Sequence, residues 1–145
     1  MTSKSAARQH DVALLLLRVG IGASMITFHG WGKISGGPER WAAVGGAMSN
    51  LGIDFLPAFW GFLAAIAESL GSALLAIGLF SRPSAALLAG TMAVAAIGHL
   101  ARPVGSPGAG PAGASHAFEL LVVYVALVLT GPGRLSLDRL LRRRG

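Results

Sequence analysis

FLPAFWGFLAAIAESLGSALLAIGLF-SRP-SAALLAGTMAVAAIGHLA, residues 55–101, contains two long apolar runs that meet at Ser81, Arg82 and Pro83. Each run approaches the roughly 20 residues that a helix needs to cross the hydrocarbon core of a bilayer. Pro83 suits the first turn of a helix, where a backbone N–H has no helical partner. Because so short a connection brings consecutive helices side by side, we expect an antiparallel pair of membrane helices.

Two further apolar runs flank this pair. The sequence therefore predicts four membrane spans, at residues 12–32, 55–80, 83–101 and 114–131. Hydrophobic residues make up 53% of the chain and charged residues 12%, which leaves too little polar surface for a soluble domain of this length. The 21 glycines are also typical of membrane helices. We expect a single domain over residues 1–145, an all-α antiparallel bundle of four transmembrane helices with a C-terminal interfacial helix.

The charge pattern argues against a nucleic-acid partner. The formal net charge is +6, but the basic residues gather at the edges of the predicted spans. On one side of the membrane these residues are Lys4, Arg8, Arg82, Arg134, Arg139, Arg142, Arg143 and Arg144, and on the other side they are Lys33, Arg40 and Arg102. The excess of positive charge on the first side predicts that both termini lie in the cytoplasm. The chain has no cysteine, which excludes disulfides, thiol catalysis and cysteinyl iron–sulfur clusters.

The termini and connections carry further predictions. Arg18 interrupts the first apolar run and no clear A-x-A site follows, so we interpret the run as an uncleaved span. The long connection after it predicts a short surface helix around residues 40–50. The tryptophans lie near the outer boundary, where this side chain anchors helices at headgroup level. Ser136 is suited to cap a short helix with leucines on one side and arginines on the other, an anchor on an anionic leaflet.

Ionisable residues inside the predicted spans are the candidates for function, because a charge in lipid costs several kcal/mol and usually faces the bundle interior. These residues are Arg18, His29, Glu68, His99, His116 and Glu119. Counting along antiparallel helices places the three histidines and Glu119 at a similar outer depth, with Glu68 below them. Arg18 lies deeper, within reach of Glu68, and we expect these two side chains to form an ion pair.

Each of these residues also has a purely structural interpretation. Arg18 can extend to the cytoplasmic headgroups. Glu68 can pair with Arg18, or stay protonated and donate a hydrogen bond to a neighbouring helix. The histidines lie close enough to water to be interfacial, whereas a carboxyl group in the middle of a span is harder to explain without a function.

If the outer side chains meet, they form a polar pocket that opens to the outside. A quinone headgroup needs hydrogen-bond donors at its carbonyls and a route for protons, and His, Glu and Arg in an apolar pocket supply both. Imidazole and carboxylate also bind zinc, iron and copper, but the chain has no compact motif such as H-E-x-x-H, and we assign no metal ligand. A path for protons or a small solute is a further alternative.

Several short motifs resemble those of DoxX, a family of small bacterial membrane proteins with four spans. The similarity extends from Leu15 to Leu140. The motifs that carry it are Leu16-Leu17-Arg18, Gly30-Trp31-Gly32-Lys33-Ile34 with Gly36, Glu68 with Gly71, Gly78-Leu79-Phe80-Ser81-Arg82, Gly131-Pro132-Gly133 and Ser136-Leu137-Asp138-Arg139. With Lys33 from the second motif, the candidate ligand-binding residues are His29, Lys33, Glu68, His99, His116 and Glu119.

The resemblance implies a place in membrane redox systems, because family members include a subunit of a thiosulfate:quinone oxidoreductase and proteins tied to oxidative-stress complexes. We therefore expect an integral redox subunit of the bacterial plasma membrane, with quinone as the candidate cofactor. If the chain takes part in catalysis, we expect it to act as an accessory subunit of a quinone-linked oxidoreductase. The sequence identifies no catalytic residue. The expected partners are a peripheral redox enzyme, another membrane subunit or a second copy of the chain. A non-catalytic scaffold or assembly factor, and a small-solute or proton carrier, are the alternatives.

Overall fold

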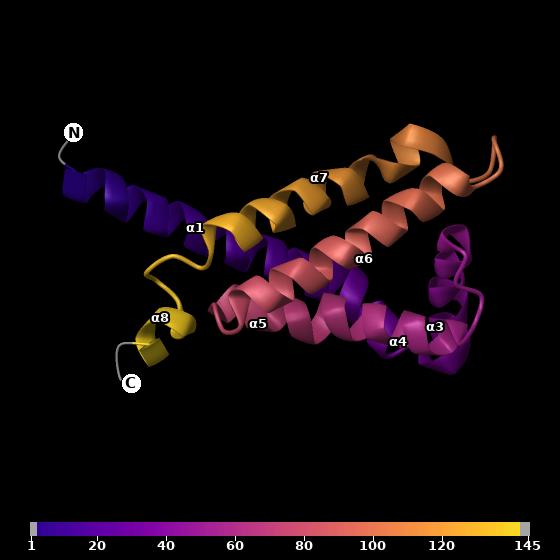
Figure 1. Ribbon diagram of the computed structural model, residues 1–145, viewed down its shortest axis with the longest axis horizontal. Coiled ribbons are helices and arrows are strands. Elements are labelled where there is room, and N and C mark those ends of the chain that lie inside the picture. The colour runs from indigo at the N-terminus through magenta and orange to yellow at the C-terminus, as the bar shows by residue number, and fades with distance from the viewer. Residues whose placement is uncertain (1–2, 143–145) are drawn as a thin grey trace.

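The computed structural model describes residues 3–142 and contains helices but no β-strand in that range (Figure 1). Arg143 and Arg144, two of the basic residues counted above, lie outside the described residues. The first half of the chain forms α1 (Ser3–Met25), η1 (Ile26–Gly30), α2 (Trp31–Ile34), α3 (Gly37–Gly45) and η2 (Gly46–Leu51). The remainder forms α4 (Pro57–Ile66), η3 (Ala67–Gly71), α5 (Ser72–Ile77), α6 (Ser81–Ala101), α7 (Gly110–Thr130) and α8 (Leu137–Arg142).

Four helical stretches are long and apolar enough to cross a membrane, namely Lys4–Ile34, Pro57–Ile77, Ser81–Ala101 and Gly110–Thr130. They confirm the predicted fold class, an all-α protein with four antiparallel membrane spans. Both termini lie at one end of the bundle, beside the turn between α5 and α6, and α3 lies at the opposite end (Figure 1). We call these the terminal end and the α3 end.

The core is apolar and so is the outer surface. Leu14, Met25, Leu75, Leu88, Met92, Tyr124 and Leu127 are buried where the spans meet. Large apolar side chains also cover the outside, and Val122 and Leu129 are among those that the protein leaves exposed. A helix that is apolar on all sides is suited to lipid, because its backbone polar groups are satisfied within the helix. The chain is therefore a multi-pass membrane protein whose surroundings are a lipid bilayer.

The predicted surface helix is confirmed as α3, which continues into the 3₁₀ turn η2. Two glycines bring α3 and α4 into direct backbone contact. A Cβ atom at Gly45 would collide with the carbonyl of Pro57, and one at Gly61 would collide with the carbonyl of Trp41. The Trp41 ring packs on Phe62 of α4 with ring centroids 4.7 Å apart. The contact holds α3 firmly against the second span.

Both of the first two spans contain a π turn, η1 in the first and η3 in the second. The two turns touch, since a Cβ atom at Gly30 in η1 would collide with the backbone carbonyl of Glu68 in η3. A π turn adds one residue to a helical turn, so the side chains that follow it are rotated away from the positions that an unbroken α-helix would give them. Such turns are frequent at functional sites.

The C-terminal helix α8 is present, and it is hydrogen-bonded to the bundle. Ser136 Oγ accepts a hydrogen bond from Arg139 N at 3.3 Å, as expected of a helix cap. Asp138 N donates to the carbonyl of Gly78 at 2.8 Å. In return, the Asp138 carboxylate accepts hydrogen bonds from Phe80 N at 2.8 Å and Ser81 N at 2.9 Å. One side chain of α8 therefore caps the start of the third span.

Candidate functional site

Glu68 is paired with Lys33 inside the bundle. The Glu68 side chain is 1% exposed and that of Lys33 21% exposed. Lys33 Nζ donates to Glu68 Oε1 and Oε2, each at 2.6 Å. Glu68 comes from η3 in the second span, and Lys33 comes from α2 at the end of the first. Burial of a single charge costs far more than burial of a compensated pair, so the two residues are expected to stay together.

The structure corrects the expected pairing of Arg18 with Glu68. The Arg18 side chain is fully buried, but its guanidinium bonds to backbone carbonyls. Nη2 donates to Leu135 O at 2.5 Å, and Nη1 lies 3.5 Å from Leu75 O. These carbonyls belong to the terminal end of the bundle. The prediction failed because the sequence did not reveal that Lys33, after the π turn η1, reaches Glu68, or that the C-terminal segment supplies a carbonyl to Arg18.

Lys33 is held in place by the surface helix. Its backbone carbonyl accepts a hydrogen bond from Trp41 Nε1 at 2.8 Å. Because Trp41 also packs on Phe62, the indole connects α2, α3 and α4 at the level of the ion pair. The folding of the connection after the first span therefore fixes where the Lys33 ammonium lies.

A cavity of about 900 Å³ lies between α3 and η2 on one side and α4, η3 and α6 on the other. Both partners of the ion pair, Lys33 and Glu68, line it. The apolar lining residues include Val44, Met48, Leu63, Leu87 and Val94. Polar and charged lining residues are Arg40, Asn50, Trp60, Thr91, His99 and Arg102. A mostly apolar cavity with a few polar groups is typical of a small-molecule site.

His99 is the one histidine of the predicted set that lines this cavity. Its Nδ1 atom lies 2.7 Å from the carbonyl oxygen of Gly108, in the loop before α7. Since a carbonyl oxygen can only accept, Nδ1 carries the proton, and Nε2 of the neutral ring is an acceptor. Arg102 Nη1 donates to Pro107 O in the same loop at 3.0 Å. The loop thus orients His99 of α6 and Arg102, the residue that follows this helix.

The structure separates the other predicted ligand-binding residues from this cavity. His29 in η1 and His116 in α7 stack on one another, with ring centroids 5.4 Å apart and planes inclined by 23°. Glu119, one helical turn further along α7, is exposed on the bundle surface. None of these three residues lines the cavity that contains Lys33, Glu68 and His99. Among residues 3–142, no three side chains of the types that bind metals come together.

Sequence reasoning did not select Arg40, Trp60, Thr91 and Arg102 as part of the site. Arg102 follows His99 by three positions, a spacing that places two side chains on one face of a helix, and this signal was available. Arg40 becomes part of the site only because α3 folds back across α4. Nothing in the local sequence indicates that fold-back, which depends on the close contacts of Gly45 and Gly61.

The sequence model of the DoxX family matches residues 13–100. The chain belongs to the DoxX family. The matched stretch contains Lys33, Glu68 and His99, whereas His116 and Glu119 lie beyond its end. No curated protein and no solved structure matches the chain.

Proposed function

We propose that this DoxX protein is an integral subunit of a membrane redox system and binds a quinone headgroup in the cavity beside α3. The observation that carries the proposal is a buried ion pair, Lys33 with Glu68, on the wall of an otherwise largely apolar cavity. A membrane-spanning chain has little structural need for such a pair, because burial of two charges gains little over apolar packing. Its position in a cavity favours a role in ligand binding.

The residues present fit a quinone in size and in chemistry. A volume of about 900 Å³ lies within the range of small-molecule pockets. The cavity also reaches the outer surface of α6, where Leu87 is 49% exposed and Gly90 is exposed. In a bilayer that surface faces lipid, which supports entry of an apolar molecule from the membrane and not from water.

A bound quinone supplies two-electron, two-proton redox chemistry in the lipid phase. Lys33 Nζ has three N–H donors and spends at most two on Glu68, so one is available for a carbonyl oxygen. Glu68 can hold a proton close to that oxygen. His99 Nε2 can accept a proton or a hydrogen bond at the side of the cavity near Gly108. The apolar walls keep water from these groups.

The electron donor is a partner. The chain has no cysteine, so sulfur-based transfer would have to occur elsewhere. We propose a peripheral redox enzyme or another membrane subunit in this role, with a second copy of the chain as a further candidate for assembly. On this proposal the DoxX protein is an accessory subunit of a quinone-linked oxidoreductase.

Binding of a quinone analogue by the purified protein tests the proposal, and quenching of tryptophan fluorescence can report it because Trp60 lines the cavity. We expect Glu68→Gln to raise Kd about tenfold, because it removes the partner that holds Lys33 Nζ at the cavity wall and a hydrogen bond to a charged group contributes about 1.5–3 kcal/mol. His99→Ala should raise Kd by roughly threefold to tenfold for an analogue that carries a hydroxyl group, because Nε2 can accept a hydrogen bond from that hydroxyl. His116→Ala is the matched control, because that histidine lies outside the cavity lining, and it should leave Kd unchanged. Unchanged binding in both cavity variants would favour the scaffold interpretation.

We also propose that the terminal end faces the cytoplasm of a bacterial plasma membrane. The basic residues Arg82, Arg134 and Arg139 lie at that end and support this orientation. Reporter fusions after Gly52 and Gly105, both in turns at the α3 end, should report an external location. A fusion after Arg142 should report an internal one. A cytoplasmic signal from both of the first two fusions would reverse the orientation.

A further inference from the structure

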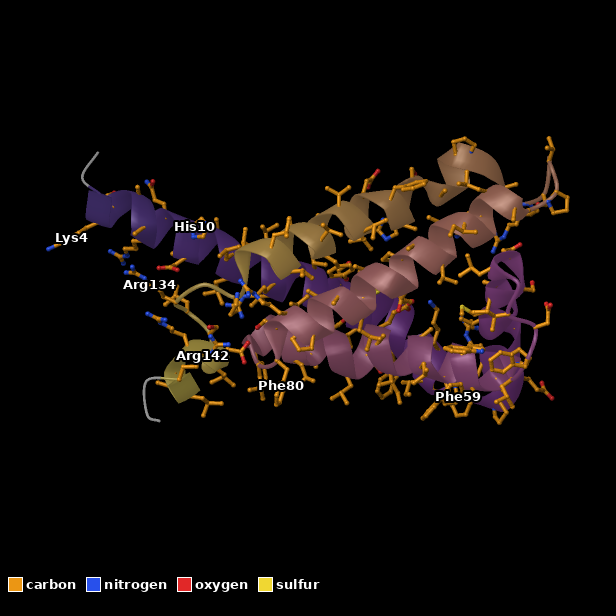
Figure 2. The ribbon with its side chains drawn as sticks, in the orientation of Figure 1. Lys4, His10, Phe59, Phe80, Arg134 and Arg142 are labelled. Carbon is orange, nitrogen blue, oxygen red and sulfur yellow. The ribbon has the colours of Figure 1, made fainter. Side chains whose placement is uncertain are left out.

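A second cavity, of about 480 Å³, lies at the terminal end, far from the proposed quinone site. It is bounded by the start of α6, the connection between α7 and α8, and α8 itself. Four arginines line it, Arg82, Arg134, Arg139 and Arg142, together with two aspartates, Asp11 and Asp138. Arg134 and Arg142 lie on this side of the bundle, between the start of α1 and α8 (Figure 2). The lining therefore carries more positive than negative charge.

Both carboxylates are already occupied by the protein. Asp138 accepts hydrogen bonds from Phe80 N and Ser81 N at the start of α6. Asp11 accepts one from Arg134 N at 2.8 Å, and its second oxygen lies 3.9 Å from Arg134 Nε. Within residues 3–142, the only arginine that forms an ion pair with either aspartate is Arg134, although Arg142 lies near Asp138.

The guanidinium groups of Arg82, Arg139 and Arg142 form none of the ion pairs within residues 3–142. Within residues 3–142, these three guanidinium groups form a single hydrogen bond, a long one from Arg82 Nη2 to Leu129 O at 3.4 Å. Guanidinium groups bind phosphate oxygens through two parallel N–H donors, and an arginine cluster at the mouth of a cavity is suited to a phosphate.

The depth of the cavity in the membrane identifies the source of that phosphate. Ser81 begins one span and Thr130 ends another, and the cavity lies at this boundary. Phospholipid phosphates lie at the same level, where spans leave the hydrocarbon core. Phe80 lines the cavity and is 63% exposed, and Leu129, beside Arg82, is 73% exposed. A ligand bound here places its anionic group among the arginines, and its apolar part can extend from there into the hydrocarbon core of the bilayer.

We propose that this cavity is a binding site for an anionic phospholipid, whose phosphate is held by Arg82, Arg139 and Arg142. Its acyl chains lie along the apolar surface formed by Phe80 and Leu129. This site differs from diffuse attraction of a basic tail to a charged leaflet, because the start of α6 and α8 enclose the headgroup between them. It does not depend on the proposed quinone site at the other end of the bundle.

Native mass spectrometry of the full chain in mild detergent can test the site, with phosphatidylglycerol as the anionic probe and phosphatidylcholine as the zwitterionic one. We expect preferential retention of phosphatidylglycerol. The double variant Arg82→Gln with Arg139→Gln should weaken it by roughly tenfold or more, because charge-assisted hydrogen bonds are lost at two positions. Both arginines are exposed, so the variant should keep the wild-type thermal unfolding temperature.

The matched control removes the same charge at the same end of the molecule, with Lys4→Gln and Arg8→Gln, neither of which lines this cavity. The control should change the affinity by less than about twofold. Equal losses in the two double variants would overturn the site in favour of diffuse attraction, as would a lack of preference for the anionic lipid. If the arginine variant fails to fold, Arg82→Lys is the substitute, since it keeps the charge and loses the paired donors.

Soluble phosphate is the alternative source of the same chemistry. We expect inorganic phosphate at about ten millimolar, far above the lipid concentration, to leave bound phosphatidylglycerol in place, because it lacks the apolar contact with Phe80 and Leu129. Displacement of the lipid by inorganic phosphate, with loss of that effect in the arginine variant, would assign the cavity to a soluble ligand and overturn the lipid proposal.

Discussion

The two ends of the bundle treat a buried charge in different ways. At the terminal end, the Arg18 guanidinium is fully enclosed and bonds to the backbone carbonyls of Leu75 and Leu135. At the α3 end, Glu68 is just as deeply buried, yet its partner is the side chain of Lys33 and both line a cavity. The first arrangement uses a charge to join segments of the chain, and the second keeps two charged side chains beside a space that a ligand can enter.

The difference follows from what surrounds each charge. The Leu75 carbonyl is in the last turn of α5, the end of a helix that carries partial negative charge, and it accepts a hydrogen bond from Gly78 N at 3.1 Å besides facing Arg18. A cation suits that position, so Arg18 needs no carboxylate. Glu68 lies in the middle of the second span, where no comparable set of backbone N–H groups is free, and a cationic side chain has to compensate it. Arg18→Lys keeps the positive charge but loses the guanidinium donors that reach two carbonyls. It should therefore retain less of the free energy of unfolding than the same substitution would at a simple ion pair.

The largest effect is expected from breaking the pair at the α3 end. Glu68→Gln leaves Lys33 as a partly buried charge without its partner, and loss of one member of a buried pair costs about 3–5 kcal/mol. Lys33→Met combined with Glu68→Gln should recover part of the loss. The free energy of unfolding, from denaturant titration in mixed micelles, gives the four values of this double-mutant cycle.

The matched cycle uses Arg18→Met and Glu68→Gln. Because the two side chains share no partner, and Leu75 lies about two helical turns beyond Glu68 along the second span, their effects should add to within about 0.5 kcal/mol. Strong coupling of Glu68 to Arg18, with none to Lys33, would show that the pairing is the one expected from helical spacing and would remove the contrast between the two ends.

The sequence was sufficient to predict the membrane spans, but it was insufficient to predict which groups pair with the buried charged side chains. Long apolar runs and a three-residue turn determine where the chain crosses the membrane, since lipid requires helices that satisfy their own backbone. Counting along the predicted helices then placed Arg18 within reach of Glu68. The π turn η1 lies between Arg18 and the end of that span, and it shifts the face on which Lys33 appears.

The cavity itself depends on contacts between distant residues. Lys33 was selected through a motif, and Glu68 and His99 through their charge in an apolar run, so three of its polar groups were candidates from the sequence. The position of α3 over the cavity was not predictable, because α3 reaches α4 only through the close approach of Gly45 and Gly61. A glycine in a connecting segment gives no sign of which backbone it will touch.

The second-largest effect tests the packing of the terminal end. Gly78 has φ of +74°, and a Cβ atom there would collide with the Arg18 guanidinium and with Ser136. Gly78→Ala should therefore lower the free energy of unfolding by about 2–4 kcal/mol, because alanine is strained in the left-handed backbone conformation and overpacks the site. Thermal unfolding in mild detergent measures this loss of stability. Gly90→Ala is the control, since a Cβ atom at Gly90 meets nothing within 4 Å inside a helix, and it should leave stability unchanged or slightly raised.

A smaller effect is expected at the helix cap of the same end. Asp138→Asn weakens the hydrogen bonds to Phe80 N and Ser81 N, and loss of a helix N-terminal cap costs about 0.5–2 kcal/mol. Burial raises the pKa of the Asp138 carboxyl, but hydrogen bonds from Ser81 and Phe80 and the nearby Arg142 outweigh burial, so the pKa is lowered overall. The carboxylate therefore stabilises the folded state above its unfolded pKa of about 3.9.

That contribution is lost as pH falls through the lowered pKa of the folded protein. The difference in unfolding temperature between wild type and Asp138→Asn should be constant near neutral pH and shrink below about pH 4. A difference that grows in acid would show that the carboxyl is protonated in the folded state and does not act as an ionised cap.

The smallest effect sharpens the boundary of the site at the α3 end. His29 and His116 stack outside the cavity, and His116 is exposed. Because an aromatic pair contributes about 0.5–1.5 kcal/mol and exposure reduces that value, His116→Ala should lower the free energy of unfolding by less than about 1 kcal/mol. If it instead weakened binding of a quinone analogue as much as His99→Ala, the stacked histidine pair and His99 would belong to one site, and the cavity beside α3 would be only part of it. Equal binding in His116→Ala and wild type would confine the ligand to the side of the bundle where Lys33 meets Glu68.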